Sequence, residues 1–211
     1  MVSRTLYFSP GACSLAPHIA LEEAGLPFEA VRVALAQGEQ NAPPFRAINP
    51  KGRVPALAED GWVLTECPAI LRYVARLAPG LWPDDPRLDA RCTEWLAWCS
   101  SGVHVTYAHV RRPERYADDE GAKALIVAKA KEACRAVWAE VDARIGAGPW
   151  ALGDTFSVAD AYLMPFWLWG RASFLAFDMP RDYPSWTAHA RRMAERPAVR
   201  RVLEREGLEL P

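Results

Sequence analysis

Residues 4–33 read RTLYFSPGACSLAPHIALEEAGLPFEAVRV, and this stretch decides the fold of the first part of the chain. Its first five residues predict a short buried strand, and the turn signal at 9–11 ends it. Apolar residues recur at helical spacing over 14–24, and Gly25 ends that helix. The apolar–polar alternation at 28–33 predicts a second strand, parallel to the first because a helix lies between them. The stretch is therefore a βαβ unit.

The segments that follow complete a first domain. A polar, proline-bearing stretch at 37–50 predicts a loop with a short helix. Residues 54–58 and 62–64 flank an acidic-glycine turn and predict a hairpin, with Pro55 at the start of its first strand. A helix is predicted to begin after residues 65–67. We expect a thioredoxin-like βαβ-ββα domain over 1–78 and a proline-rich linker over 79–87.

Beyond the linker the pattern is helical throughout. Residues 87–109, 121–146, 157–176 and 184–205 each carry apolar residues at helical spacing. The segment Ser157-Val158-Ala159-Asp160 resembles a capping box, with a role in folding. The predicted fold class is α/β plus all-α, with an all-helical domain over 88–211 that carries a hydrophobic substrate pocket.

Composition excludes several classes of partner. The chain has 211 residues, with 25 Lys and Arg against 26 Asp and Glu, for a net charge of -1. A net charge this close to zero creates no overall electrostatic field that would attract nucleic acid or acidic membranes. No stretch approaches the roughly 20 apolar residues of a spanning helix, and the N-terminus shows no signal-peptide pattern, so we expect a cytoplasmic protein.

The cysteines and histidines argue against a disulfide framework and against a metal. Five cysteines, an odd number without C-x-x-C spacing, fit a reducing compartment with at least one free thiol. His104 and His109 are five residues apart and fall on different helix faces, so we predict no metal. The chain also lacks a Gly-rich phosphate loop, so we predict no nucleotide.

Cys13 and Ser14 are the strongest candidates for catalytic residues in the sequence because of their position at the start of a helix. They follow a strand and open a helix, where free backbone N–H groups and the helix dipole stabilise a thiolate. The alternative is that Cys13 is a small buried residue and Ser14 an ordinary N-cap.

Two further segments suit a peptide-like ligand. A cis bond before Pro55 would leave the Val54 backbone free to pair with an extended peptide, whereas a trans proline would merely begin a strand. At Thr65-Glu66-Cys67-Pro68, a helix N-terminus beside Glu66 suits an α-amino acid head group, with its carboxylate on the N–H groups and its ammonium on Glu66. The alternative is capping of the helix by Thr65 or Glu66.

In this order the segments resemble the glutathione S-transferase family, and the bacterial beta class most closely. The matching stretches cover essentially the whole chain: GACSLAPH (11–18), FRAINPKGRVPAL (45–57), LTECPAILRYVA (64–75), EWLAWCSSGVH (94–104), WALGDTFSVADAYL (150–163) and RMAERPAVRRVLEREGL (192–208). The resemblance implies a homodimeric detoxification enzyme that conjugates glutathione, as co-substrate, to a small apolar electrophile.

The resemblance also assigns roles to residues. Cys13 would face the glutathione sulfur with Ser14 adjacent, and His104 would approach it from the helical domain; these three are the implied catalytic residues. Glutathione would be bound by Cys13, Arg53, Val54, Pro55, Glu66, Cys67, Ser101 and His104, with a cis Pro55. The electrophile pocket would be lined by Phe8, Pro10, Tyr107, His109, Arg111 and Trp167.

Departures from the family pattern leave alternatives open. Gly38, Ala97 and Val105 stand where close relatives have lysine, asparagine and lysine, and Cys67 stands for a common serine, so affinity for glutathione is expected to be reduced. Cys13 could instead form mixed disulfides, making the protein a glutathione-dependent thiol transferase or disulfide reductase. A non-catalytic ligand-binding protein on the same fold is the other alternative.

Overall fold

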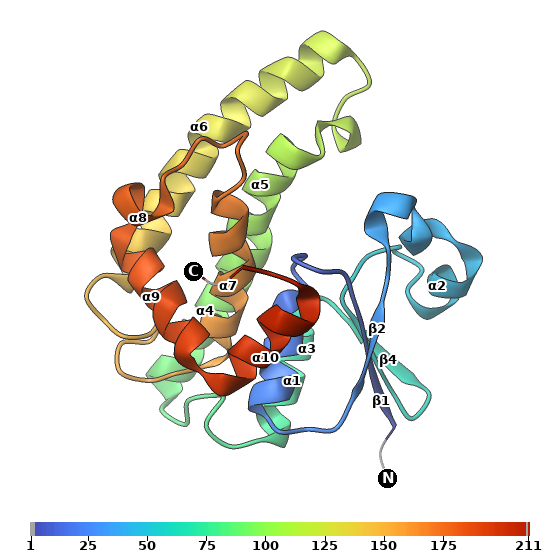
Figure 1. Cartoon of the computed structure of the whole chain (residues 1–211), viewed down its shortest axis with the longest axis vertical. Coiled ribbons are helices and arrows are strands. Elements are labelled where there is room, and N and C mark those ends of the chain that lie inside the picture. The colour runs from blue at the N-terminus through green and yellow to red at the C-terminus, as the bar shows by residue number, and fades with distance from the viewer. Residues whose placement is uncertain (1–2, 210) are drawn as a thin grey trace.

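The computed structural model describes residues 3–209 and Pro211. Its first domain is built on one sheet, with strand order β2-β1-β3-β4. β1 (Arg4–Phe8) pairs in parallel with β2 (Glu29–Arg32) and antiparallel with β3 (Ala56–Glu59), and β3 forms the hairpin with β4 (Trp62–Thr65). The predicted βαβ-ββα order is confirmed, and the domain lies to the right in Figure 1.

Helices cover the sheet. α1 (Leu15–Glu23) and α3 (Cys67–Leu77) pack together on the side facing the second domain, and the side chains of Leu15, Ile19 and Ile70 have no solvent exposure. The short helix expected at 37–50 is α2 (Pro43–Ile48), preceded by 3-10 turns η1 (Leu35–Gln37) and η2 (Glu39–Asn41). Phe45 of α2 packs with Val33 and Val54 in a small apolar core, which holds this segment against the sheet domain.

The second domain is all-helical, as predicted. It contains α4 (Pro86–Trp98), the π turn η3 (Cys99–Val103), α5 (His104–Arg111), the 3-10 turn η4 (Pro113–Arg115), α6 (Glu120–Ile145), α7 (Val158–Gly170), α8 (Met179–Asp182), α9 (Pro184–Glu195) and α10 (Pro197–Glu206). α7 runs through the middle of the domain (Figure 1), and most of its residues are buried. Across the described residues, no helix combines the length and the apolar character needed to cross a membrane.

Three predicted helices differ in extent from the observed ones. The helix expected over 184–205 is two helices, because Arg196 is extended (φ -72°, ψ 127°), as a residue before proline prefers, and Pro197 opens α10. The helix expected over 157–176 ends at Gly170. The helix expected over 87–109 contains the π turn just before His104, which rotates the following residues relative to α4.

The capping box at the start of α7 is present. Ser157 Oγ accepts from the Ala159 N–H, and Asp160 Oδ2 accepts from the Ser157 N–H at 2.8 Å. The other carboxylate oxygen of Asp160 accepts from the Ala151 N–H at 2.7 Å and from His189 Nε2 at 2.9 Å. The carboxylate of Asp160 therefore links α7 to α9 through His189 and to the loop before α7 through Ala151. The side chains of Asp160 and His189 are both fully buried.

The loop before Cys13 is held by the helical domain. The Gly11 N–H donates to Glu206 Oε2 at 2.9 Å, and Trp169 Nε1 donates to the Gly11 carbonyl at 2.7 Å. Glu206 also pairs with the buried His18 of α1, with Oε1 2.7 Å from Nδ1. The two domains therefore share one apolar core. Beside the predicted site they are also joined by the polar contacts of Glu206 and Trp169 with the first domain.

Candidate functional site

Two adjoining cavities lie between the domains. We name the first, of about 160 Å³, the Glu66 cavity; it is lined by Cys13, Asn49, Arg53, Val54, Pro55, Glu66, Cys67, Ser100, His104, Val105, Ala108, Arg115, Tyr116 and Tyr162. The second, of about 170 Å³, is the Trp169 cavity, lined by Ala12, Cys13, Leu35, Gln40, Gly52, Arg53, Val54, His104, Tyr107, Ala108, Arg111, Arg112, Arg115 and Trp169. Six residues line both cavities and form the junction between them: Cys13, Arg53, Val54, His104, Ala108 and Arg115.

Cys13 is placed at this junction by a turn and a helix start. Gly11 has φ +67°, which a glycine adopts without strain, and α1 begins two residues after Cys13. Residue Cys13 is 9% exposed, and its Sγ lies 3.5 Å from the Val54 carbonyl oxygen. Its place at the mouth of α1 favours a nearby thiolate electrostatically.

The Val54–Pro55 peptide bond is cis, as expected from the resemblance. Asn49, which is buried, donates through Nδ2 to the Arg53 carbonyl at 2.6 Å and so anchors the chain just before this bond. The segment 53–55 therefore presents its backbone along the Glu66 cavity rather than continuing β3.

Glu66 has a backbone conformation that is unusual for a residue with a side chain. Its φ is +74°, and it occupies the N-cap position of α3 without any capping hydrogen bond from its side chain. The capping alternative is therefore wrong for Glu66. Its exposed carboxylate pairs with Lys51 at the rim of the cavity. A carboxylate beside an open helix N-terminus is the arrangement expected for an α-amino acid head group.

Cys67 is buried behind Cys13. Its Sγ donates to the Cys13 carbonyl at 3.5 Å. Burial and the hydrogen bond with Cys13 raise the pKa of Cys67 well above its usual value, so it remains a thiol at neutral pH. All five cysteines are free thiols.

His104 enters from the helical domain as the first residue of α5. Its ring packs against Trp169, with centroids 5.0 Å apart, and is half-buried. Burial, and then the charges of Arg53 and Arg115, lower the pKa of His104 to about 4. The imidazole is therefore neutral at pH 7 and can accept or donate one hydrogen bond at the junction of the cavities.

Two predicted hydroxyls lie elsewhere. Ser14 is fully buried, and its Oγ bonds the backbone N–H and carbonyl of Ser9 at 3.1 and 3.2 Å, bracing the loop instead of facing a ligand. Ser101 is exposed and donates to the Ala97 carbonyl at 2.9 Å. The π turn places the preceding residue, Ser100, on the Glu66 cavity in its stead.

Four of the six predicted electrophile-pocket residues also lie outside both cavities. Phe8 is buried against the His18 ring, and Trp167 donates to Thr187 Oγ1 at 3.1 Å inside the helical domain. Pro10 belongs to the turn before Gly11, and His109 stacks on Tyr116 with centroids 4.0 Å apart. Tyr107 and Arg111 do line the Trp169 cavity.

Sequence reasoning missed the residues that replace them. Trp169 lies two residues after Trp167 and therefore on the opposite face of α7, where it stacks on Tyr107 at 4.5 Å. Arg115 ends η4, and Arg112 and Tyr116 are the residues on either side of this short turn. The run RRPERY at 111–116, basic and aromatic directly after the helix of His104, was the available signal.

A larger hollow, of about 640 Å³, lies near the interdomain linker around Arg72, Trp82 and Asp89. It is lined by the ends of α3 and α4 and by the segment between them, and its lining does not include Cys13, Glu66 or His104. Within the described ranges, 3–209 and Pro211, no group of three or more histidine, cysteine or acidic side chains is placed to hold a metal ion.

Comparison with known proteins agrees with this geometry. The family described as glutathione S-transferase, N-terminal domain, matches residues 2–76, and its C-terminal counterpart matches residues 104–197. The chain is 35% identical over 208 residues to glutathione S-transferase GstA of Escherichia coli O157:H7, covering 96% of this chain and 98% of that one.

Solved structures are similar over almost the full length. A glutathione transferase homologue from Sulfitobacter, solved with bound glutathione, superimposes with a TM-score of 0.91 at 40% identity, covering 99% of this chain and 100% of that one. A bacterial beta class enzyme from Sphingomonas chungbukensis gives a TM-score of 0.81 at 38% identity, covering 97% and 100%. The chain belongs to the glutathione S-transferase family.

Proposed function

We propose that this glutathione transferase binds glutathione in the Glu66 cavity and transfers it to a small electrophile held in the Trp169 cavity. One observation carries the proposal: a position for the ligand thiol, a backbone segment that can pair with a peptide, and a site for an amino-acid head group all line a single cavity. These are Cys13, the backbone around cis Pro55, and Glu66 at the mouth of α3. Their order matches the cysteinyl and γ-glutamyl units of an extended glutathione.

The charges in the cavity suit the two ends of that ligand. The α-carboxylate of the γ-glutamyl unit would accept from the free N–H groups at the start of α3, and its ammonium would take the place of Lys51 beside Glu66. Arg53, which lines both cavities, is available to the glycyl carboxylate. The relative from Sulfitobacter was solved with glutathione, which supports this assignment.

The chemistry follows from the junction of the cavities. A glutathione thiol beside Cys13 lies at the mouth of α1, where the helix dipole lowers the pKa of a bound thiol. Neutral His104, which lines the same cavity, would hydrogen-bond the sulfur. The thiolate attacks the electrophilic carbon, a carbon–sulfur bond forms, and the leaving group departs with its bonding electrons. The cavity contributes mainly orientation and exclusion of water.

Titration with glutathione by calorimetry, followed by conjugation of 1-chloro-2,4-dinitrobenzene, tests the proposal. We expect binding and conjugation, with conjugation retained within about tenfold in Cys13→Ala because a side chain that does not react contributes only electrostatics and hydrogen bonding. Cys13→Ser is the matched control that keeps a polar group at the position.

A disulfide-exchange assay on the same samples distinguishes the thiol transferase alternative from conjugation. Exchange through Cys13 requires its thiolate, so Cys13→Ala would abolish exchange if that chemistry were the main activity. Exchange without conjugation in the unaltered protein would contradict the proposal. Absence of glutathione binding at millimolar concentration would favour the non-catalytic ligand-binding alternative.

We also propose that the protein acts as a cytoplasmic homodimer. Large apolar side chains are exposed on the edge strand β4 and at the end of α3: Trp62 is 47% exposed and Leu77 is 42% exposed. Such residues are typical of a surface that is covered by a partner. Light scattering after size-exclusion chromatography tests the dimer, and Trp62→Glu is expected to give a monomer. The free thiols support a reducing compartment.

A further inference from the structure

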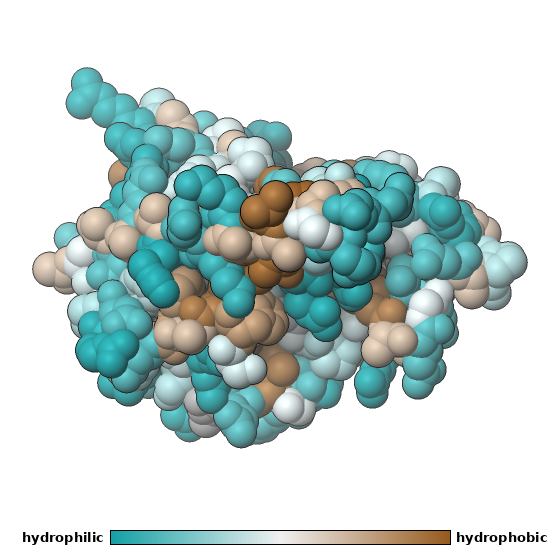
Figure 2. Space-filling model, turned by 90° about the horizontal axis from the view of Figure 1, so that it is seen from above, coloured by the Kyte–Doolittle hydropathy of each residue, from teal (hydrophilic) through white to brown (hydrophobic). Residues whose placement is uncertain are grey.

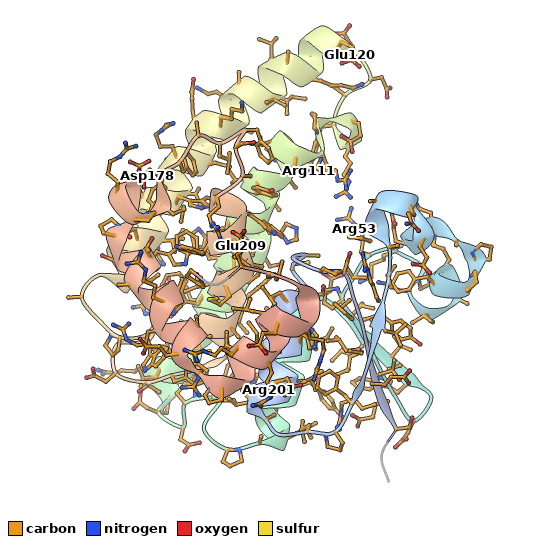
Figure 3. The ribbon with its side chains drawn as sticks, in the orientation of Figure 1. Arg53, Arg111, Glu120, Asp178, Arg201 and Glu209 are labelled. Carbon is orange, nitrogen blue, oxygen red and sulfur yellow. The ribbon has the colours of Figure 1, made fainter. Side chains whose placement is uncertain are left out.

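Four arginines line the Trp169 cavity from both domains. Arg53 belongs to the first domain, while Arg111, Arg112 and Arg115 come from the end of α5 and from η4. Figure 3 shows Arg53 and Arg111 on opposite sides of the space between the two domains. Among the residues that the structure describes, the lining of this cavity includes no aspartate or glutamate.

These guanidinium groups are poorly neutralised. Arg112 lies 3.8 Å from Glu114, in an exposed pair, and within the described part of the chain Arg53, Arg111 and Arg115 form no ion pair. Burial, and then the like charges of Arg53 and Arg112, lower the pKa of Arg115. Other arginines of the chain are close to carboxylates; Arg196, for example, binds Glu23 through two nitrogens at 2.7 Å.

This concentration of charge is local, because the whole chain has a net charge of -1. Four guanidinium groups that line one cavity repel one another, and an anion placed among them relieves that repulsion and accepts charge-assisted hydrogen bonds. Glutathione itself needs one cation for its glycyl carboxylate, which Arg53 supplies. Arg111 and Arg112 line only the Trp169 cavity, and Arg115 lines both cavities, so the electrophile side holds more positive charge than glutathione requires.

The rest of the cavity is suited to a flat ring. Tyr107 and Trp169 stack with centroids 4.5 Å apart and an interplanar angle of 23°. The cavity volume is about 170 Å³. Cavities of roughly 150 Å³ hold one benzene ring. From above, hydrophobic residues reach the surface near the middle of the molecule, with hydrophilic residues around them (Figure 2).

We propose that the acceptor substrate is a single-ring aromatic electrophile with an acidic substituent, a carboxylate or sulfonate, bound by Arg111, Arg112 and Arg115. The inference rests on the proposed transferase function and specifies its substrate class. For an aryl chloride, the glutathione thiolate forms the carbon–sulfur bond, chloride leaves with the electron pair of the carbon–chlorine bond, and the thiol proton is released to solvent. The acidic group takes no part in the bond changes; it fixes the ring.

The test compares 4-chloro-3-nitrobenzoate with its neutral isostere 4-chloro-3-nitrobenzamide. Each kcat/KM is divided by the uncatalysed rate constant with glutathione, so that ring reactivity cancels. We expect a preference for the benzoate of about tenfold or more, since charge-assisted hydrogen bonds to arginine are strong. In Arg111→Gln/Arg115→Gln the ratio of the corrected benzoate efficiency to the corrected benzamide efficiency should fall to about one. Arg87→Gln, which changes an exposed side chain of α4, should keep the ratio of the unaltered protein.

Two results would overturn the inference while the transferase function stands. One is an equal corrected efficiency for the two substrates; the other is a preference unchanged in the double variant. If neither chloride reacts, calorimetry with the two S-aryl glutathione conjugates decides: equal affinities overturn the inference, and tighter binding of the carboxylate conjugate, lost in the double variant, supports it. Failure of the proposed function is recognised separately, as absence of glutathione binding.

Discussion

The two walls of the cleft are built differently. The wall from the first domain presents backbone features: the turn before Cys13, the cis bond before Pro55 and the left-handed Glu66 at the start of α3. The wall from the helical domain presents side chains, among them His104, Tyr107, Trp169 and the arginines of η4.

In the proposed function, the first wall recognises glutathione, which is the same in every reaction, and the second wall recognises the electrophile, which differs between transferases. Backbone groups and helix ends keep their positions when neighbouring side chains change, so the first wall can lose polar side chains such as those absent at Gly38 and Cys67 and still present its hydrogen-bonding groups. The second wall changes with every substitution.

The largest effect is expected at Asp160, on which the helical wall depends through α7. Asp160→Ala leaves the N–H groups of Ala151 and Ser157 and the buried His189 without their acceptor. We expect a loss of about 3–5 kcal/mol in the free energy of unfolding, measured by urea denaturation. Ser157→Ala removes one capping acceptor and should cost about 1 kcal/mol. Equal losses in the two variants would contradict a central role for Asp160.

Glu66 tests the wall of the first domain. Glu66→Gln removes the charge proposed to face the ligand ammonium, so the Kd for glutathione measured by calorimetry should rise about 10- to 50-fold. Lys51→Gln is the matched control: it frees Glu66 from its ion pair and should leave the affinity unchanged or slightly tighter. Weaker binding in Lys51→Gln would show that Lys51, not Glu66, contacts the ligand.

His104 gives the helical wall a pH signature. Its pKa is about 4 in the folded protein and about 6.5 when unfolded, so the unfolded state binds more protons between these values. The corresponding stability is fully present above pH 6.5 and is lost as the pH falls towards 4. Between pH 7 and pH 4 the protein should lose roughly 2 kcal/mol more than His104→Asn, because solvent still reaches part of the ring and weakens the effect. Parallel pH profiles of unfolding would refute this assignment.

The smallest effect is expected at Cys67. Because the thiol is a poor hydrogen-bonding group, Cys67→Ser should tighten glutathione binding only about two- to fivefold. Cys67→Ala provides the comparison and should show no gain. A loss of affinity in Cys67→Ser would mean that the buried thiol serves to pack Cys13 in place, through its contact with the Cys13 carbonyl.

The first wall could be predicted from the sequence because its features are local. The turn at Gly11, the proline at 55 and the helix start after Glu66 are each set by a few neighbouring residues, and the resemblance to the family placed them in one site. Even there, local pattern did not show that Ser14 turns inwards to bond Ser9. The orientation of a side chain at a helix start depends on which backbone groups of the preceding loop lack a hydrogen-bond partner, here the N–H and carbonyl of Ser9.

The second wall could not be predicted in the same way. Whether Trp167 or Trp169 faces the cavity depends on the rotation of α7, which is fixed by packing against α1, α4 and α9. The choice between Ser100 and Ser101 depends on the π turn. Arg112 and Arg115 reach the cavity from the segment after α5, where the non-helical backbone of Arg112 before Pro113 ends the helix. These are consequences of tertiary packing, and helical periodicity alone does not contain them.

The bonds to Gly11 have a consequence for recombination between relatives. Both polar groups of this peptide segment are engaged from the second domain, the N–H by Glu206 and the carbonyl by Trp169. A chimera that joins residues 1–78 to the helical half of another transferase keeps the Cys13 turn only if that half offers an acceptor and a donor at the same two points. The exchangeable unit in evolution is thus the first domain together with its two distant supports.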